Sequence, residues 1–192
     1  MRHVAVISGT YLLPIGRGKR YVSNWSGFVN GLTSGWSINS IVTLQGGFPF
    51  SPQLSYNPSG NGDTRNPVRP FLNPNFSGPI ILGNPGQWFN PKAFLAPTNV
   101  AANLGFYGNV GRDTLTGPGL ATWDFSMLKD TRIRERLSLE FRAEIFNLLN
   151  RANFNTPNGV AFTPSGVSPT AGAITSTSTT SRQVQFGLKL LW

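Results

Sequence analysis

Five stretches of the chain alternate apolar and polar residues, a pattern that places successive side chains on opposite faces of a β-strand. The stretches are His3–Leu13, Gly35–Gln45, Leu120–Lys129, Arg136–Asn147 and Arg182–Trp192. In the last stretch, every second residue up to the end is large and apolar: Val184, Phe186, Leu188, Leu190 and Trp192. The pattern therefore predicts an all-β chain with about five main strands. Some positions depart from the alternation: Val4, Val6, Ser40, Ile41 and Leu191.

The fourth stretch, "LSLEFRAEIFNLLN", fits two structures. A helix would leave Leu139 outside the apolar stripe formed by Leu137, Phe141, Ile145 and Leu148. A strand sorts nine consecutive residues without error and gathers one apolar face: Leu137, Leu139, Phe141, Ala143 and Ile145. We predict a strand here and keep an amphipathic helix as the alternative.

The connections between the stretches alternate in length, at roughly 20, 75, 6 and 34 residues, as is typical of outer-membrane β-barrels with short periplasmic turns and long extracellular loops. The long connections are rich in Pro, Gly and Asn, and such long structureless loops are uncommon in compact soluble domains. We expect a periplasmic turn at Asp130–Glu135, which places the C-terminus on the periplasmic side.

The alternation alone leaves open what covers the apolar face. In a membrane barrel this face meets lipid and the polar face lines the lumen. In a soluble β-sandwich the same residues pack against a second sheet. We expect an antiparallel transmembrane β-barrel segment with long extracellular loops, and an incomplete barrel, because about five strands cannot close one. The alternative is a soluble β-sandwich that binds carbohydrate.

Composition excludes several classes of function. Lys and Arg number 16 against 7 Asp and Glu, a formal charge of +9, but the basic residues are scattered and carry no nucleic-acid-binding signature. We therefore expect no nucleic-acid partner. The chain has no Cys and a single His, His3, so we expect no metal site and no cofactor. The sequence contains no run of 18 apolar residues, so it predicts no transmembrane helix.

Six pieces of the sequence match a known family in the family's own order: "LPIGRGKRY", "GWSINSIVTLQGGFPFSP", "QWFNPKAF", "FYGNVGRDTLTGPGLATWDFSMLKD", "LSLEFRAEIFNLLNRANFNTPN" and "QFGLKLLW". The chain resembles the C-terminal part of the Oar-like, TonB-dependent-receptor-like barrels that are abundant in acidobacteria and myxobacteria. Full-length members usually carry a carboxypeptidase-regulatory-like domain and a plug. The apolar alternation that ends in Trp192 is similar to the signal that the barrel-assembly machinery recognises in such proteins.

The resemblance implies that residues 1–192 are the C-terminal part of a larger barrel domain, because we find no signal peptide, plug or TonB box. A receptor of this class would take up a large ligand, such as a siderophore or an oligosaccharide, by energy coupling in the cell outer membrane of a Gram-negative bacterium. Its partners would be outer-membrane lipid, the rest of its own barrel and plug, the assembly machinery and a TonB-type energy coupler.

Four charged residues are candidates for the lumen-facing side: Asp124, Glu140, Arg142 and Glu144. They could contact the substrate or the plug, and the simpler interpretation is a ladder of charges that neutralise one another across strands. Paired carboxylates could also perform acid–base catalysis, but no nucleophile or supporting partner accompanies them. We therefore expect no catalytic residue and no enzyme.

Five aromatic residues gather in the first long connection: Trp88, Phe89, Phe94, Phe106 and Tyr107. Their rings could stack on a sugar or an aromatic ligand. The simpler interpretation is that they pack this loop over the mouth of the barrel.

Overall fold

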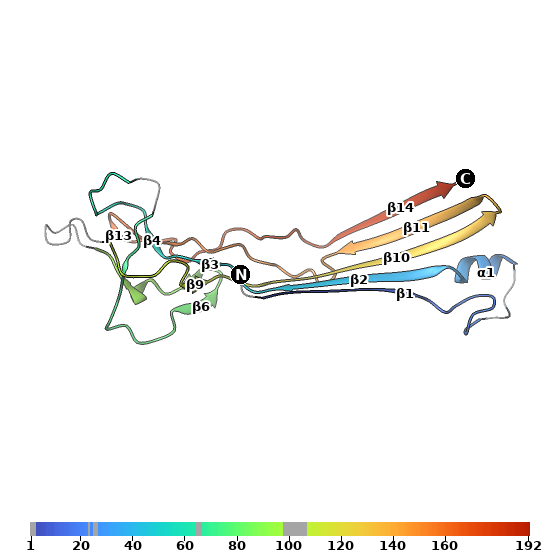
Figure 1. Ribbon diagram of the computed structural model, residues 1–192, viewed down its shortest axis with the longest axis horizontal. Helices are drawn as coiled ribbons and strands as arrows, with labels where there is room; N and C mark the ends of the chain where they lie inside the picture. Colours follow the sequence, from blue (N-terminus) through green and yellow to red (C-terminus); the bar gives the residue numbers. More distant parts are fainter. Residues whose placement is uncertain (1–2, 23, 25–26, 64–66, 98–106) are drawn as a thin grey trace. The chain divides into compact units, whose positions relative to one another are not determined.

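The structure, a computed structural model, describes residues 3–22, 24, 27–63, 67–97 and 107–192 (Figure 1). The chain divides into two compact units. The sheet unit comprises Val4–Gln45, Ala121–Ala152 and Thr179–Trp192. The loop unit comprises Met1–His3, Gly46–Leu120 and Asn153–Ser178. Each unit is therefore assembled from stretches that lie far apart in the sequence.

Five long strands of the sheet unit form one sheet in the order β1-β2-β10-β11-β14 (Figure 1). The pairs β1–β2, β10–β11 and β11–β14 are antiparallel. The prediction of about five main strands is confirmed, and the helical alternative for the fourth stretch is wrong. The strands are β1 (Val4–Leu12), β2 (Trp36–Gln45), β10 (Leu120–Arg134), β11 (Leu137–Phe146) and β14 (Gln183–Leu191).

The turn between β10 and β11 is shorter than predicted. Pairing of the two strands continues to Arg134 and Leu137, with a bulge after Arg132. The turn is therefore Glu135–Arg136 alone and does not span Asp130–Glu135. The apolar alternation fades before the strand ends, so the pattern could not show where pairing stops.

A short helix, α1 (Gly27–Thr33), joins β1 to β2 and was not predicted. It has seven residues, two of them Gly, so neither its length nor its helix propensity reveals it. Gly35 follows with φ 76°, and a Cβ at this position would lie 2.2 Å from the carbonyl oxygen of Asp130. Only glycine fits between the end of the helix and β10. Among the described residues, no helix is long and apolar enough to span a membrane.

The loop unit contains the hydrophobic core. Phe89 is 0% exposed and packs between Phe50 and Phe94, with ring centroids 6.0 Å apart in both pairs. Throughout the described part of the chain, every buried hydrophobic residue belongs to this unit: Phe50, Leu54, Val68, Phe89, Ala93, Phe94, Val110, Leu115, Ala161, Phe162 and Ala171. The long connections, expected to be structureless loops, therefore fold around a core of their own.

Strands of two to four residues form the small sheets of the loop unit, and one pair of them links the two long connections. β4 of the first connection pairs in parallel with β12 of the second, and Trp88 N donates a hydrogen bond to Gly172 O (2.8 Å). Strands this short leave no periodic signal in a sequence. The small sheets are β13 (Gly166–Val167), β12 (Val160–Thr163) and β4 (Gln53–Leu54); β3 (Pro49–Phe50) and β9 (Leu115–Thr116); β5 (Phe71–Leu72) and β8 (Phe94–Leu95); β6 (Ile81–Asn84) and β7 (Gln87–Phe89), with a 3-10 turn at Pro91–Ala93.

Asn147 directly follows β11 and ties three segments of the sheet unit together. It is 4% exposed and adopts φ 51°, a left-handed conformation that Asn tolerates better than most residues. Its backbone N donates to Asp124 Oδ1 (2.9 Å). Its side-chain Nδ2 donates to the carbonyls of Arg151 and Thr180 (3.0 Å each), and its Oδ1 accepts from Arg151 N (3.0 Å). The alternation gives no sign of this role.

We expect Asn147→Ala to lower the free energy of unfolding by about 2–3 kcal/mol, because it removes three hydrogen bonds at a buried position. Urea unfolding followed by tryptophan fluorescence measures the change. Asn75→Ala is the matched control, since Asn75 is exposed and its side chain makes no hydrogen bond within the described residues. Equal unfolding midpoints for the two variants would contradict the role assigned to Asn147.

Candidate functional site

The strand register divides the side chains of the sheet between two faces. Ile145 is paired with Phe125 on one side and with Val184 on the other, and Ile7 is paired with Val42. Residues at every second position from these pairs lie on the same face of their strands. β2 and β10 are neighbours in the sheet, and the hydrogen bond between Ser40 and Trp123 places their faces on the same side. We call this side the apolar face: Ala5, Ile7, Gly9, Tyr11, Trp36, Ile38, Ser40, Val42, Leu44, Trp123, Phe125, Met127, Lys129, Thr131, Leu139, Phe141, Ala143, Ile145, Val184, Phe186, Leu188 and Leu190.

No second sheet covers the apolar face in the described part of the sheet unit. Ile7 is 64% exposed and Phe186 is 72% exposed. The rings of Phe141 and Phe186 stack on the face with centroids 6.1 Å apart. A soluble β-sandwich would bury these residues against a facing sheet, so the alternative of a sandwich module is not favoured.

Ser40 departs from the alternation for a physical reason. It lies on the apolar face of β2, where its Oγ accepts a hydrogen bond from Trp123 Nε1 (2.8 Å) on β10. Without Ser40, the indole N–H would have no acceptor among the surrounding apolar side chains. Val4 and Val6 lie on the opposite face, as their positions in the alternation predict. Nothing in the structure explains why Ile41 lies on that face too.

Lys129 is the one charged side chain on the apolar face of the described strands, and it is 7% exposed. Its Nζ donates to the carbonyls of Gly31 (2.6 Å) and Ser34 at the end of α1, and lies 5.7 Å from the centre of the Trp36 ring. Trp36 Nε1 donates to Leu32 O (2.9 Å). Lys129 and Trp36 therefore bind carbonyls that the end of a helix leaves without partners. The positive charge of Lys129 is compensated by the dipole of α1 and by the ring of Trp36.

The polar face carries the four predicted charged residues. Glu140 Oε1 accepts from Arg142 Nε (2.6 Å), an ion pair in which the arginine is exposed and the glutamate is partly buried. Glu144 accepts from the side chain of Gln185, its neighbour on β14. Asp124 lies on the same face and accepts from Asn147 N. The structure thus brings these side chains to one face, each with a partner nearby; that this face lines a lumen remains a prediction.

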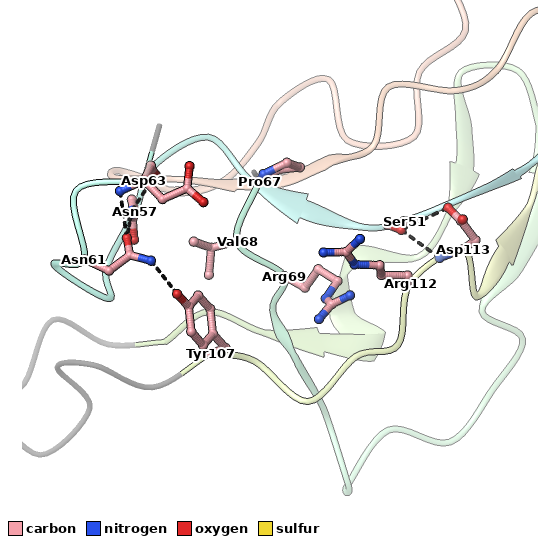
Figure 2. A pocket seen from close by; sticks show the side chains of 10 residues that line it. All are labelled: Ser51, Asn57, Asn61, Asp63, Pro67, Val68, Arg69, Tyr107, Arg112 and Asp113. Atoms are coloured by element: carbon pink, nitrogen blue, oxygen red, sulfur yellow. Dashed lines mark hydrogen bonds between the residues drawn. The ribbon is translucent and has the colours of Figure 1, made fainter. Parts of the chain in front are cut away.

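A pocket of about 480 Å³ lies in the loop unit (Figure 2). Ligand pockets in proteins are typically about 300–1,000 Å³. The walls come from residues 51–63, 67–69 and 107–113, which are separated in sequence, so the alternation and the motifs could not predict it. Its lining residues are Ser51, Asn57, Asn61, Asp63, Pro67, Val68, Arg69, Tyr107, Arg112 and Asp113.

The five predicted loop aromatics have different environments. Phe89 and Phe94 are buried in the core, so their rings are not accessible to a ligand. Trp88 is partly buried and its indole N–H donates to a backbone carbonyl. Tyr107 is 56% exposed and lines the pocket. Phe106 lies outside the described residues, and contact of Trp88 or Tyr107 with a ligand remains a prediction.

We expect Lys129→Ala to loosen α1, because the carbonyls of Gly31 and Ser34 lose their donor. The free energy that keeps the helix closed should fall by about 2 kcal/mol, so hydrogen exchange of the amides in residues 27–35 should accelerate more than tenfold. Lys189→Ala, on the polar face, is the control and should leave these amides unchanged. Unaltered exchange in Lys129→Ala would show that the lysine does not hold the helix.

Comparisons with known proteins agree with the two-faced sheet. A family described as outer membrane beta barrel domain matches residues 1–185. A comparison with curated proteins found no match, and one with solved structures found none either. The five strands, of 9, 10, 15, 10 and 9 residues, are long enough to cross the apolar layer of a bilayer, which takes about 9–11 residues. The chain therefore belongs to the outer membrane beta barrel domain family, whose location is the cell outer membrane.

Proposed function

We propose that the chain is the C-terminal barrel segment of an Oar-like, TonB-dependent-type receptor that takes up a large ligand by energy coupling. The observation that carries the proposal is the open sheet, whose edges are β1 and β14. Strand edges cannot remain unpaired in hydrocarbon, and the smallest outer-membrane barrels have about eight strands. Further strands must therefore pair with β1 and β14, as they would in the barrel of about 22 strands that such transporters form.

The two faces of the sheet would then have different partners. Outer-membrane lipid would contact the apolar face, and the polar face with Glu140 and Arg142 would line the lumen beside the plug. The barrel-assembly machinery would recognise β14 and Trp192. A TonB-type energy coupler would act through the N-terminal part of the receptor. We expect the chain to perform no catalytic step and to bind no cofactor and no nucleic acid. The family resemblance supports a siderophore or an oligosaccharide as the ligand.

Single-cysteine variants test the two faces, because the chain has no Cys of its own. In outer membranes, a membrane-impermeant maleimide should label Gln183→Cys, Gln185→Cys and Lys189→Cys but not Val184→Cys, Phe186→Cys or Leu188→Cys. All six positions are exposed in the structure, so only lipid explains protection of every second one. Equal labelling of the two sets would contradict a lipid-facing apolar face. Unfolding in urea provides the matched control, since it should make all six reactive.

The size and coupling of the native protein test the receptor itself. An antibody against Gln183–Trp192 should detect, in the outer-membrane fraction, a band several times heavier than the 20.8 kDa of this chain. Formaldehyde treatment of cells should shift that band to a complex with a TonB-type protein. A soluble band of 20.8 kDa would contradict the membrane assignment. A 20.8 kDa band in the outer membrane would contradict the large receptor and would indicate that copies of this chain assemble to close the sheet.

A further inference from the structure

We propose that the pocket of the loop unit binds an oxyanion, a carboxylate or a phosphate on a polar ligand such as a sugar acid or sugar phosphate, through the guanidinium groups of Arg69 and Arg112. This inference deepens the proposed function by naming the ligand chemistry. It rests on that function only for the later uptake of the ligand, because binding can be measured without transport.

At one end of the pocket the polar groups of the wall satisfy one another. Asn57 Nδ2 donates to Asn61 Oδ1 (2.7 Å) and to Asp63 O (2.8 Å), while Asn57 Oδ1 accepts from Ser59 N (3.0 Å). Asn61 Oδ1 also accepts from Asp63 N (2.9 Å), and Asn61 Nδ2 donates to the hydroxyl of Tyr107. These amides shape the wall, and most of their hydrogen-bonding capacity is used within it.

At the other end of the pocket, too, the polar groups of the wall bond to one another. Asp113 N donates to Ser51 Oγ (2.7 Å), and Ser51 Oγ donates to Asp113 Oδ1 (3.3 Å). Asp113 adopts φ 54°, which turns the chain sharply beside Arg112. The serine hydroxyl and Oδ1 of the aspartate therefore hold this turn.

Arg69 and Arg112 differ from the rest of the lining. In the part of the chain that the structure describes, neither guanidinium has a hydrogen bond or an ion pair. Figure 2 shows both in the middle of the pocket, between Asp63 on one side and Asp113 on the other. Each guanidinium offers five N–H donors in a planar fork that matches a carboxylate or a phosphate. Two like charges held in one pocket favour an anion between them.

The remaining lining defines the ligand further. Asp113 Oδ2, which makes no hydrogen bond within the described residues, belongs to the same lining as the arginines and can accept from a hydroxyl group, so a molecule that adds hydroxyl groups to its oxyanion fits better than a bare anion (Figure 2). Tyr107 exposes its ring at the pocket, where it can pack on the apolar side of a sugar. A sugar acid or a sugar phosphate offers all three features.

The backbone beneath Arg69 is fixed before any ligand arrives. Arg69 stands between two buried residues, Val68 and Pro70. Pro70 O accepts from Val110 N (3.3 Å), and Gly108 lies so close that a Cβ there would be 2.1 Å from Pro70 O. A preorganised site loses less entropy on binding than a mobile one.

Calorimetric titration of the protein, purified in detergent from outer membranes at low ionic strength, tests the site. The probes are trigalacturonate, its neutral methyl ester and glucose 1-phosphate. We expect trigalacturonate, glucose 1-phosphate or both to bind. If the carboxylate is the preferred group, the methyl ester should bind at least tenfold more weakly than trigalacturonate. Binding of glucose 1-phosphate alone identifies phosphate as the source of the oxyanion, and binding of both anions identifies the shared chemistry.

Charge-matched variants give the decisive comparison. Arg69→Gln and Arg112→Gln should each weaken binding of the anion about tenfold or more. Arg134→Gln removes the same charge at the β10–β11 turn, outside the pocket, and should bind as the unaltered protein does. Circular dichroism checks that all three variants fold. Failure of both anions to bind, unchanged affinity in Arg69→Gln and Arg112→Gln, or an equal loss in Arg134→Gln would overturn the proposal. These results leave the band size and the coupler complex unaffected, so the pocket and the receptor can fail separately.

Discussion

Where lipid covers the apolar face of the sheet, as we propose, no water is available to the polar groups on that face. Every hydrogen-bond donor or acceptor there must then find a partner within the protein. Trp123 and Ser40 meet this condition by bonding each other. Lys129 meets it by donating to carbonyls at the end of α1. Among the described residues, no buried side-chain nitrogen or oxygen lacks a partner. The position of α1 follows from this condition, because the helix supplies the acceptors that Lys129 requires.

The two units are stabilised in different ways. In the described sheet unit no hydrophobic side chain is buried, so strand pairing must hold it, together with the lipid that we propose covers the apolar face. The loop unit has a conventional core around Phe89, which supports short strands that could not persist alone. A rigid core also explains how the loop unit can fix the backbone at Arg69 without a long strand or helix.

The main strands could be predicted from sequence because alternation is a local property, visible in residues such as Val184, Phe186 and Leu188. The partner of Ser40 could not, since Trp123 lies 83 residues away. Lys129 stood at the end of the predicted third stretch, where nothing showed that the strand continues or that a helix receives the charge. The pocket could not be predicted for the same reason, since Arg69 and Arg112 come from separate segments that carry no periodic pattern.

The interleaving of the two long connections has a consequence for assembly. The first connection joins β2 to β10 and the second joins β11 to β14, yet β4 of one pairs with β12 of the other. Neither connection can complete the core alone, because Leu54 comes from the first and Phe162 from the second. Pairing of β10 with β11 raises the effective concentration of one connection for the other. Within the second connection, Ser178 N donates a hydrogen bond to Asn153 O (2.7 Å), so folding of the core also joins the two ends of that connection. The loop that must close before β14 pairs with β11 becomes shorter, and folding of the loop unit therefore lowers the entropic cost of adding the last strand.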